Sequence, residues 1–221
     1  MLLKCIVIII AIASVILMIP QYAAFVSEKN EEKTGFKEAI VKYKRFIVVA
    51  AIGCIGFAVY SCLLHYESWM GAVLVVHNQL LWNICFLIAA IDFKVKKIPN
   101  RTVIAILLVH TAYLIVRVCA NPGQWKEAVF PSLIGLLAGT LFMAVCFAVS
   151  RGGVGGGDLK LYSSLGYCYG LVGIVAILLY SLLPAIIVGV ALMVMKKAKF
   201  KTMMPMAPFI LLGLTLYLVL R

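Results

Sequence analysis

Residues 161–195, LYSSLGYCYGLVGIVAILLYSLLPAIIVGVALMVM, form the longest stretch of this chain without a charged side chain. Its 35 residues are too many for one membrane-spanning helix, which needs about 20, and too few for two full-length helices. Gly166 and Gly170 interrupt the stretch, and glycine weakens a helix. We therefore predict a break near residue 170, with a short helix over 158–169 and a full span over 171–195.

The composition of the whole chain indicates a membrane protein. Of the 221 residues, 65% are hydrophobic and 13% are charged, and mean hydropathy is +1.11. A soluble domain cannot bury that much apolar surface. The other predicted spans are 5–27, 46–64, 68–91, 102–116, 128–150 and 202–220. The stretch 102–116 is short, but Arg117 can extend it by snorkelling. We expect one domain, an all-α polytopic helix bundle of about eight transmembrane segments, one of them short.

The distribution of lysine and arginine predicts the orientation of this bundle. With both termini outside, 16 of the 20 basic residues fall in inner loops, as the positive-inside rule requires. The segment 27–45 then becomes a cytoplasmic loop. A cleaved signal peptide over 5–27 would disturb this pattern, so we expect the first helix to be retained. The loop charges also account for the net charge of +12, and we expect the lipid bilayer, and no nucleic acid, as a partner.

Asp92 and Asp158 are the only aspartates in the chain. The charge pattern places both at cytoplasmic ends of their helices, with Asp92 closing the third span and Asp158 opening the sixth. Carboxylates beside a bilayer are costly and usually functional. The alternative is structural: Asp92 pairs with Lys94 or Lys96 as a helix-end charge, and Asp158 is an N-cap.

A pair of aspartates suits peptide hydrolysis. Two carboxylates that share a site do not both ionise easily, so one is protonated and one is charged. The charged aspartate takes a proton from water, and the other donates a hydrogen bond to the scissile carbonyl and then a proton to the leaving amine. Because the pair titrates as a unit, neither Asp92 nor Asp158 has a fixed role.

Two short elements support the aspartates. Gly155, Gly156 and Gly157 precede Asp158 and allow a substrate strand to approach the backbone closely. A helix that starts there is shorter than the membrane, so Asp158 should lie below the surface, in an enclosed or water-filled cavity. The sequence Ile98-Pro99-Asn100 predicts a turn after Asp92. For Lys160, the chain leaves open tuning of the pair, binding of lipid phosphate, or a plain loop charge.

Cysteine and histidine give no sign of a metal site. The seven cysteines are scattered through apolar segments, and none forms a Cys-x-x-Cys pair, so zinc and iron–sulfur sites are not expected. His77 and His110 lie within predicted spans, and His65 is expected near the outer side. We predict buried or interfacial histidines, no metal and no cofactor.

At these residues the chain resembles the type IV prepilin peptidases, membrane aspartyl proteases of the Gly-x-Gly-Asp group. In that family the first catalytic aspartate precedes an Ile-Pro element, as Asp92 precedes Ile98-Pro99-Asn100. The second lies in Gly-x-Gly-Asp-x-Lys, matched by Gly155-Gly156-Gly157-Asp158-Leu159-Lys160. Pro205-Met206-Ala207-Pro208-Phe209 is a degenerate version of a Pro-Phe-Gly-Pro-like family segment. The resemblance covers roughly 80–221.

The resemblance implies cleavage of the short basic leader, ending in glycine, from prepilins or pilin-like proteins. The partner would be a substrate with an N-terminal hydrophobic helix, and the enzyme would lie in the cytoplasmic membrane of a bacterium or archaeon. Many bacterial members also methylate the new N-terminus, using an N-terminal cytoplasmic domain that often has four paired cysteines. This chain has only 27–45 there and no paired cysteines. We therefore expect a short form without methyltransferase activity.

Two other functions remain as alternatives. Presenilin or signal-peptide-peptidase proteases share Gly-x-Gly-Asp, but they usually have Tyr-Asp at the first aspartate and Pro-Ala-Leu near the end. This chain has Ile91-Asp92 and Ala207-Pro208-Phe209 instead. An ion-coupled transporter would place its carboxylates near the midplane of the membrane, between broken helices. The charge pattern places Asp92 and Asp158 near the inner face.

Overall fold

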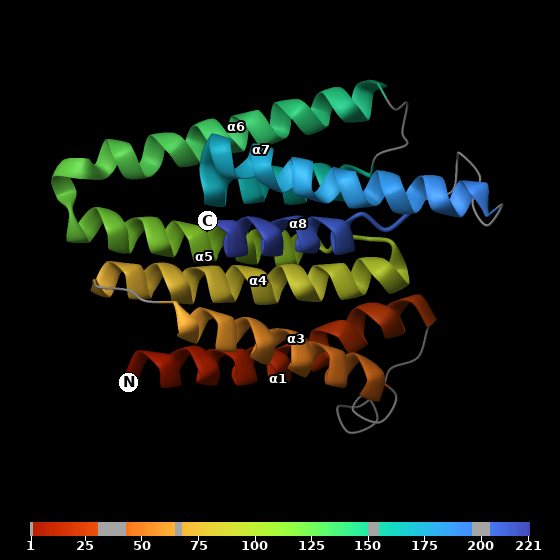
Figure 1. The fold of residues 1–221 in the computed structure, drawn as a ribbon, viewed down its shortest axis with the longest axis horizontal. Helices are drawn as coiled ribbons and strands as arrows, with labels where there is room; N and C mark the ends of the chain where they lie inside the picture. Colours follow the sequence, from red (N-terminus) through yellow and green to blue (C-terminus); the bar gives the residue numbers. More distant parts are fainter. Residues whose placement is uncertain (1, 31–42, 65–67, 150–154, 196–203) are drawn as a thin grey trace. The chain divides into compact units, whose positions relative to one another are not determined.

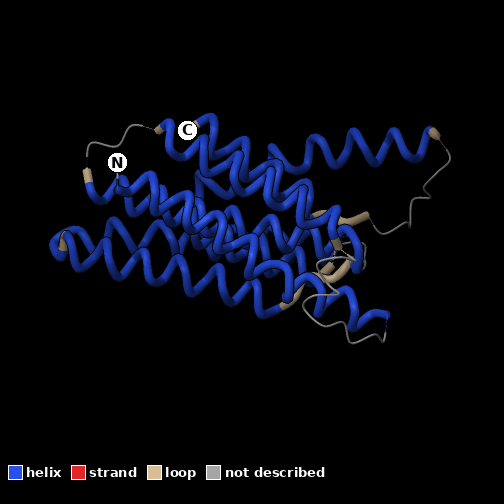
Figure 2. Tube along the Cα trace, turned by 90° about the horizontal axis from the view of Figure 1, so that it is seen from below, coloured by secondary structure: helices blue, strands red, loops and turns tan. Residues whose placement is uncertain are grey.

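The computed structural model describes residues 2–30, 43–64, 68–149, 155–195 and 204–221. These residues form helices and connecting turns, and no strand occurs among them (Figures 1 and 2). The elements are α1 (Leu2–Asn30), α3 (Lys44–Leu63), α4 (Trp69–Val95), α5 (Asn100–Ala120), the 3-10 turn η1 (Pro122–Gln124), α6 (Trp125–Val149), α7 (Gly156–Val194) and α8 (Ala207–Leu220). The predicted all-α fold is confirmed.

Helix α7 contains the predicted break. Its 39 residues are helical except at Gly170, which has φ 69° and ψ −172°, a conformation that favours glycine. Tyr162 Oη and Ser181 Oγ are 2.6 Å apart, whereas 19 residues of straight helix would separate them by about 28 Å. Segments 156–169 and 171–194 therefore fold back on each other as an antiparallel helical hairpin, and the break near residue 170 is confirmed.

Each predicted segment has a matching helical segment among the described residues, with differences at the ends. In the part of the chain that the structure describes, six helices, α1 and α3 to α7, are long and apolar enough to cross a membrane, and α7 supplies two segments because of its break. Helix α8 is shorter than the predicted span 202–220. It has 14 residues and begins at Ala207. Pro205 disfavours helix at the residue before it, whereas Pro208 lies in the first turn, where the missing amide is tolerated. Helix α1 extends to Asn30, and the part of the loop over 31–42 lies outside the described residues.

The first compact unit, Met1–Val95, contains α1, α3 and α4. Helix α1 packs against both of the others. Aromatic rings join the helices: Tyr22 of α1 stacks on Phe46 of α3 at 3.8 Å between centroids, and Phe57 of α3 stacks on Trp82 of α4 at 4.9 Å. Aromatic pairs of this kind stabilise packing beyond the area they bury.

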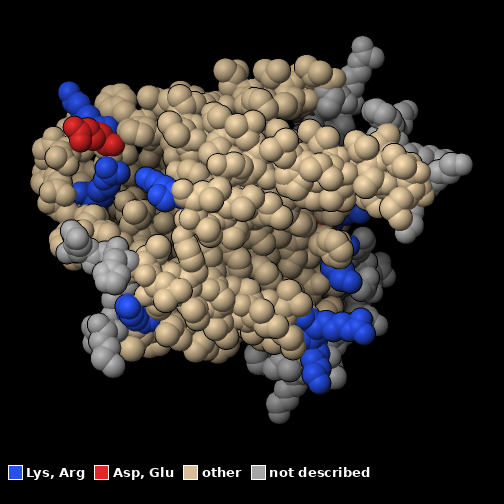
Figure 3. All heavy atoms as spheres, in the orientation of Figure 1, with Lys and Arg blue, Asp and Glu red and all other residues tan. Residues whose placement is uncertain are grey.

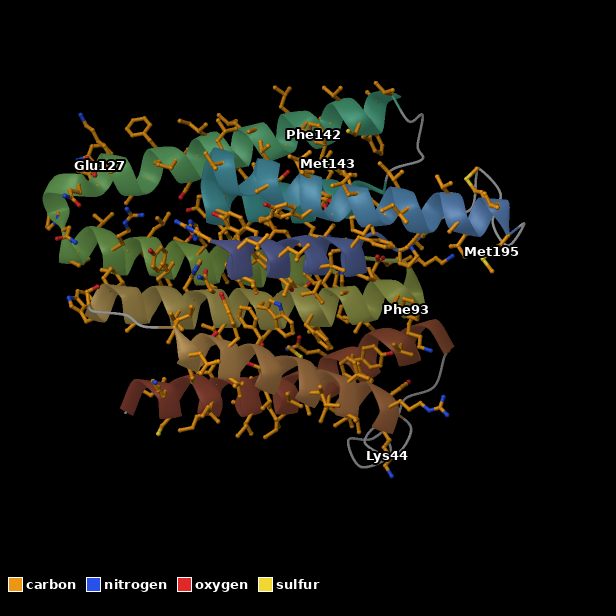
Figure 4. All side chains as sticks on the ribbon, viewed as in Figure 1. Lys44, Phe93, Glu127, Phe142, Met143 and Met195 are labelled. Atoms are coloured by element: carbon orange, nitrogen blue, oxygen red, sulfur yellow. The ribbon has the colours of Figure 1, made fainter. Side chains whose placement is uncertain are left out.

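The second unit, Lys96–Arg221, is built around α7, which packs against α5, α6 and α8. Gly135 of α6 lies so close to α7 that an added Cβ would stand 2.5 Å from the Gly170 Cα. The small residues of Gly135-x-x-x-Gly139 and Gly166-x-x-x-Gly170 thus allow α6 and α7 to pack closely. Along α6, Met143 is buried and Phe142 is exposed (Figure 4).

Within each unit the flanks of the helices are apolar. Ile52 of α3 and Leu137 of α6 are exposed, and large apolar side chains of this kind are costly in water. Lysine and arginine side chains of the described residues lie toward the helix ends on the face drawn in Figure 3. Apolar flanks between charged ends are the pattern of helices that cross a bilayer.

Candidate active site

Asp92 lies close to the end of α4. The helix ends at Val95, and Lys96 follows with a φ of 55°, a left-handed residue of the kind that commonly terminates helices. Asp92 is 5% exposed, whereas its neighbour Phe93, labelled in Figure 4, is 65% exposed. The Asp92 side chain is therefore largely shielded from solvent, and both its catalytic role and the alternative of a helix-end charge beside Lys94 or Lys96 stay predictions.

The element Ile98-Pro99-Asn100 forms the predicted turn. Pro99 is the N-cap of α5, and its carbonyl accepts hydrogen bonds from the Thr102 hydroxyl at 2.7 Å and the Thr102 amide at 3.2 Å. Pro99 is buried and Asn100 is exposed. The connection between α4 and α5 is thus only four residues long, 96–99.

Asp158 belongs to the first turn of α7. The N-cap of this helix is Gly155, so the alternative of Asp158 as an N-cap is wrong. The Asp158 amide donates to the Gly155 carbonyl at 3.1 Å, and the side chain folds back toward the same residue, since a Cβ added to Gly155 would lie 3.2 Å from Asp158 Oδ2. The half-buried carboxylate therefore lies at the positive end of the α7 dipole, which stabilises negative charge.

Within the second unit, the start of α5 meets the start of α7. Lys160 Nζ donates to Asn100 Oδ1 at 3.0 Å, and a Cβ added to Gly157 would lie 3.0 Å from Ile98 Cβ. The structure thus brings together two supporting elements that lie far apart in the sequence, Ile98-Pro99-Asn100 and the glycines before Asp158. The Lys160–Asn100 hydrogen bond itself was not predicted, because the two residues are 60 positions apart.

The histidines have structural partners. His77 and His110 are buried, as predicted, while His65 lies outside the described residues. His110 Nε2 is 3.1 Å from Ser132 Oγ, and its ring meets Tyr167 edge-on at 4.7 Å. In the part of the chain that the structure describes, no group of three or more His, Cys, Asp or Glu residues could hold a metal ion.

The structure defines a class of protein: a polytopic helical membrane protein with one aspartate near the end of a helix and another in a glycine-initiated first turn. Residues 80–190 match the type IV leader peptidase family. This segment is half of the chain and includes Asp92, Asp158, the turn at Ile98-Pro99-Asn100 and the three glycines. The chain belongs to the type IV leader peptidase family.

A curated relative supports this assignment. The chain is 31% identical over 131 residues to a prepilin leader peptidase/N-methyltransferase of Bacillus subtilis (strain 168). The alignment covers 59% of this chain and 50% of the relative, so the chain spans about half the length of that protein. No solved structure matches the chain. The family match ends at residue 190, so the degenerate segment 205–209 stays a prediction.

Proposed function

We propose that this protein is a membrane aspartic endopeptidase that removes the short leader from prepilins or pilin-like proteins. The observation that carries the proposal is the family match over 80–190, because that segment contains both aspartates in their motifs. It favours this function over a presenilin-type protease and over a transporter. The name of the Bacillus relative supports the same substrate class.

In the proposed mechanism, Asp92 and Asp158 act as one unit. One carboxylate is charged and removes a proton from water as the water attacks the scissile carbonyl. The other is protonated, donates a hydrogen bond to the carbonyl oxygen, and then supplies a proton to the leaving amine. The pair shares its protons, so both orders of assignment are equivalent.

The covalent chain supports the pairing. Asp92 is six residues from Ile98, and the first three of these steps continue α4. At about 1.5 Å per helical residue and about 3.5 Å per extended residue, the two Cα atoms are at most about 15 Å apart. Ile98 packs beside Gly157, the residue before Asp158. The chain between Asp92 and Ile98 is thus short enough for the pairing that we propose.

We further propose that this site faces the cytoplasm of a bacterial or archaeal cell. Lys94, Lys96, Lys97 and Arg101 surround the turn after Asp92 and are all exposed, and basic loops stay on the cytoplasmic side. Single cysteines placed in 94–101 should react with a membrane-impermeant maleimide only from the cytoplasmic side. Labelling from outside would contradict the orientation.

The direct test is processing of a pilin-like substrate. The protein is co-expressed with a prepilin that carries a basic leader and an N-terminal apolar helix, and the substrate is analysed by intact mass. We expect loss of the leader. We also propose that no methylation follows, so the mature substrate should lack an added mass of about 14 Da. Unprocessed substrate would overturn the peptidase proposal, and methylated product would overturn the second proposal alone.

The three glycines before Asp158 should differ in importance. A Cβ at Gly157 would meet Ile98 Cβ at 3.0 Å, whereas a Cβ at Gly156 would meet no atom within 4 Å. Because Ile98 Cβ is fixed to its backbone, Gly157→Ala must shift the start of α7 and with it Asp158. We expect leader cleavage to fall by about tenfold or more, since small displacements are costly in catalysis.

Gly156→Ala is the matched control for this prediction. It makes the same chemical change one residue away, in open space, so leader cleavage should fall much less than with Gly157→Ala. Initial rates in membranes, normalised to the amount of folded enzyme, give the comparison. Equal rates for the two variants would contradict the role of the Gly157–Ile98 contact.

A further inference from the structure

Buried polar side chains join the three helices of the first unit. Gln79 of α4 donates from Nε2 to Asn83 Oδ1 at 3.0 Å and to the Cys54 carbonyl of α3 at 3.4 Å. Asn83 Nδ2 donates to Ser14 Oγ of α1 at 2.9 Å, and Ser61 Oγ of α3 donates to Gln79 Oε1 at 3.3 Å. Gln79 is 0% exposed and Asn83 is 2% exposed.

This network lies on one face of α4. Its two amides are four residues apart, so they are stacked on the same side of the helix. Through hydrogen bonds of these amides, α4 is joined to α1 and to α3. Both helices therefore lie on the side of α4 that carries Gln79 and Asn83, which we call the network face. Trp82, stacked on Phe57 of α3, borders the same side.

Asp92 lies on the opposite face of the same helix. It follows Asn83 by nine residues, which is about 2.5 turns, or roughly 180° of rotation. It follows Gln79 by thirteen residues, about 3.6 turns, which again leaves it on the far side. Helix α4 has no proline, so this angular relation holds along its length. Asp92 is thus directed away from α1 and α3.

The network allows α4 only one rotation about its axis. A turn of one residue, about 100°, would remove Gln79 and Asn83 from their partners and leave buried amides unpaired, which is costly. Apolar contacts alone define rotation less sharply in a bilayer, because lipid is as apolar as the side chains it replaces.

We infer that the Gln79–Asn83 pair is a positioning element that fixes the rotation of α4 and thereby the direction of the Asp92 carboxylate. The inference rests on the proposed function only for its effect on cleavage. The effect of the network on this orientation can be measured in a protein that cleaves nothing.

The orientation is tested by cysteine labelling. In a background without the seven native cysteines, Asp92→Cys and Phe93→Cys report on neighbouring positions that are 5% and 65% exposed. A maleimide should react much faster at 93 than at 92. When Gln79→Leu and Asn83→Leu are added, the ratio of the two rates should fall toward one. An unchanged ratio in folded protein would overturn the inference, whatever the enzymatic activity.

The effect on cleavage is tested separately. Asn83→Leu should lower kcat by roughly 10- to 100-fold, because the carboxylate is displaced, with KM little changed, because substrate binding is not the interaction removed. The exchange variant Gln79→Asn with Asn83→Gln keeps two amides on the network face and should recover much of kcat. A loss confined to the yield of folded protein, with normal kcat, would show a structural role only and overturn the inference.

Two further variants keep the test decisive. If the double leucine variant does not fold, Ser14→Ala removes only the α1 arm of the network, and its labelling ratio should still fall. Thr111→Val is the control for loss of a polar group outside the first unit. This exposed hydroxyl donates to the Leu107 carbonyl of its own helix at 2.8 Å and lies 3.4 Å from Tyr167 Oη. If unsubstituted enzyme processes no prepilin while the labelling ratio falls as expected, the proposed function fails and the positioning inference stands.

Discussion

Asp92→Asn and Asp158→Asn are each expected to abolish leader cleavage, with rates at least about 10³-fold lower. Asparagine keeps the size of the side chain, but it neither ionises nor supplies a proton. A water molecule then has no base at one step, or the leaving amine has no acid at the next. Either substitution removes the whole cycle, because the two carboxylates act as a unit.

Processing of a prepilin, followed by intact mass and normalised to folded enzyme, measures this effect. Glu127→Gln is the matched control, because it neutralises an exposed carboxylate in the first turn of α6. The control should process substrate normally. The double variant Asp92→Asn with Asp158→Asn should be no worse than either single change, since effects within one catalytic unit are not additive. Normal processing by either single variant would eliminate the aspartate pair.

The break in α7 shows what the sequence could predict. An uncharged stretch of 35 residues fits neither one span nor two, and glycine at 170 offers the place where the backbone can reverse. In the structure Gly170 adopts the positive φ that this reversal requires. Length, charge and glycine are local properties, and together they correctly predicted that this stretch forms two helical segments.

Contacts between distant residues could not be predicted in the same way. The Lys160–Asn100 hydrogen bond joins residues 60 positions apart, and nothing local to either residue specifies the other. Gln79 and Asn83 did leave a signal, since two amides four residues apart in an apolar span need buried partners. Their partners on α1 and α3 still depend on how the helices pack.

The start of α8 differed from its prediction because the apolar sequence continues through Pro205, whereas the helix begins only after this proline.

The glycine contact between α6 and α7 should dominate the stability of the second unit. A Cβ added at Gly135 would lie 2.5 Å from Gly170 Cα, and it would come closer still to the Gly166 carbonyl oxygen. Both are backbone atoms, so no side chain can move aside, and α6 must separate from the α7 hairpin. We expect Gly135→Ala to lower the free energy of unfolding by about 3 kcal/mol or more, the upper range for overpacking.

Gly56→Ala is the control, and its effect should have the opposite sign. Gly56 is an exposed residue in the middle of α3, and an added Cβ would meet no atom within 4 Å. Alanine there should stabilise the protein by up to about 1 kcal/mol, because glycine is a poor helix former. Gly139→Ala should fall between the two, since its Cβ would lie 2.9 Å from the Tyr162 carbonyl oxygen.

Thermal unfolding in detergent distinguishes these cases. A loss of about 3 kcal/mol lowers Tm by roughly 6–12 °C in a chain of this size, whereas Gly56→Ala should leave Tm unchanged or slightly raised. The comparison isolates packing from helix propensity, because the same methyl group is added to a helix in all three variants. Equal Tm values for Gly135→Ala and Gly56→Ala would contradict the close contact of α6 with α7 at Gly135.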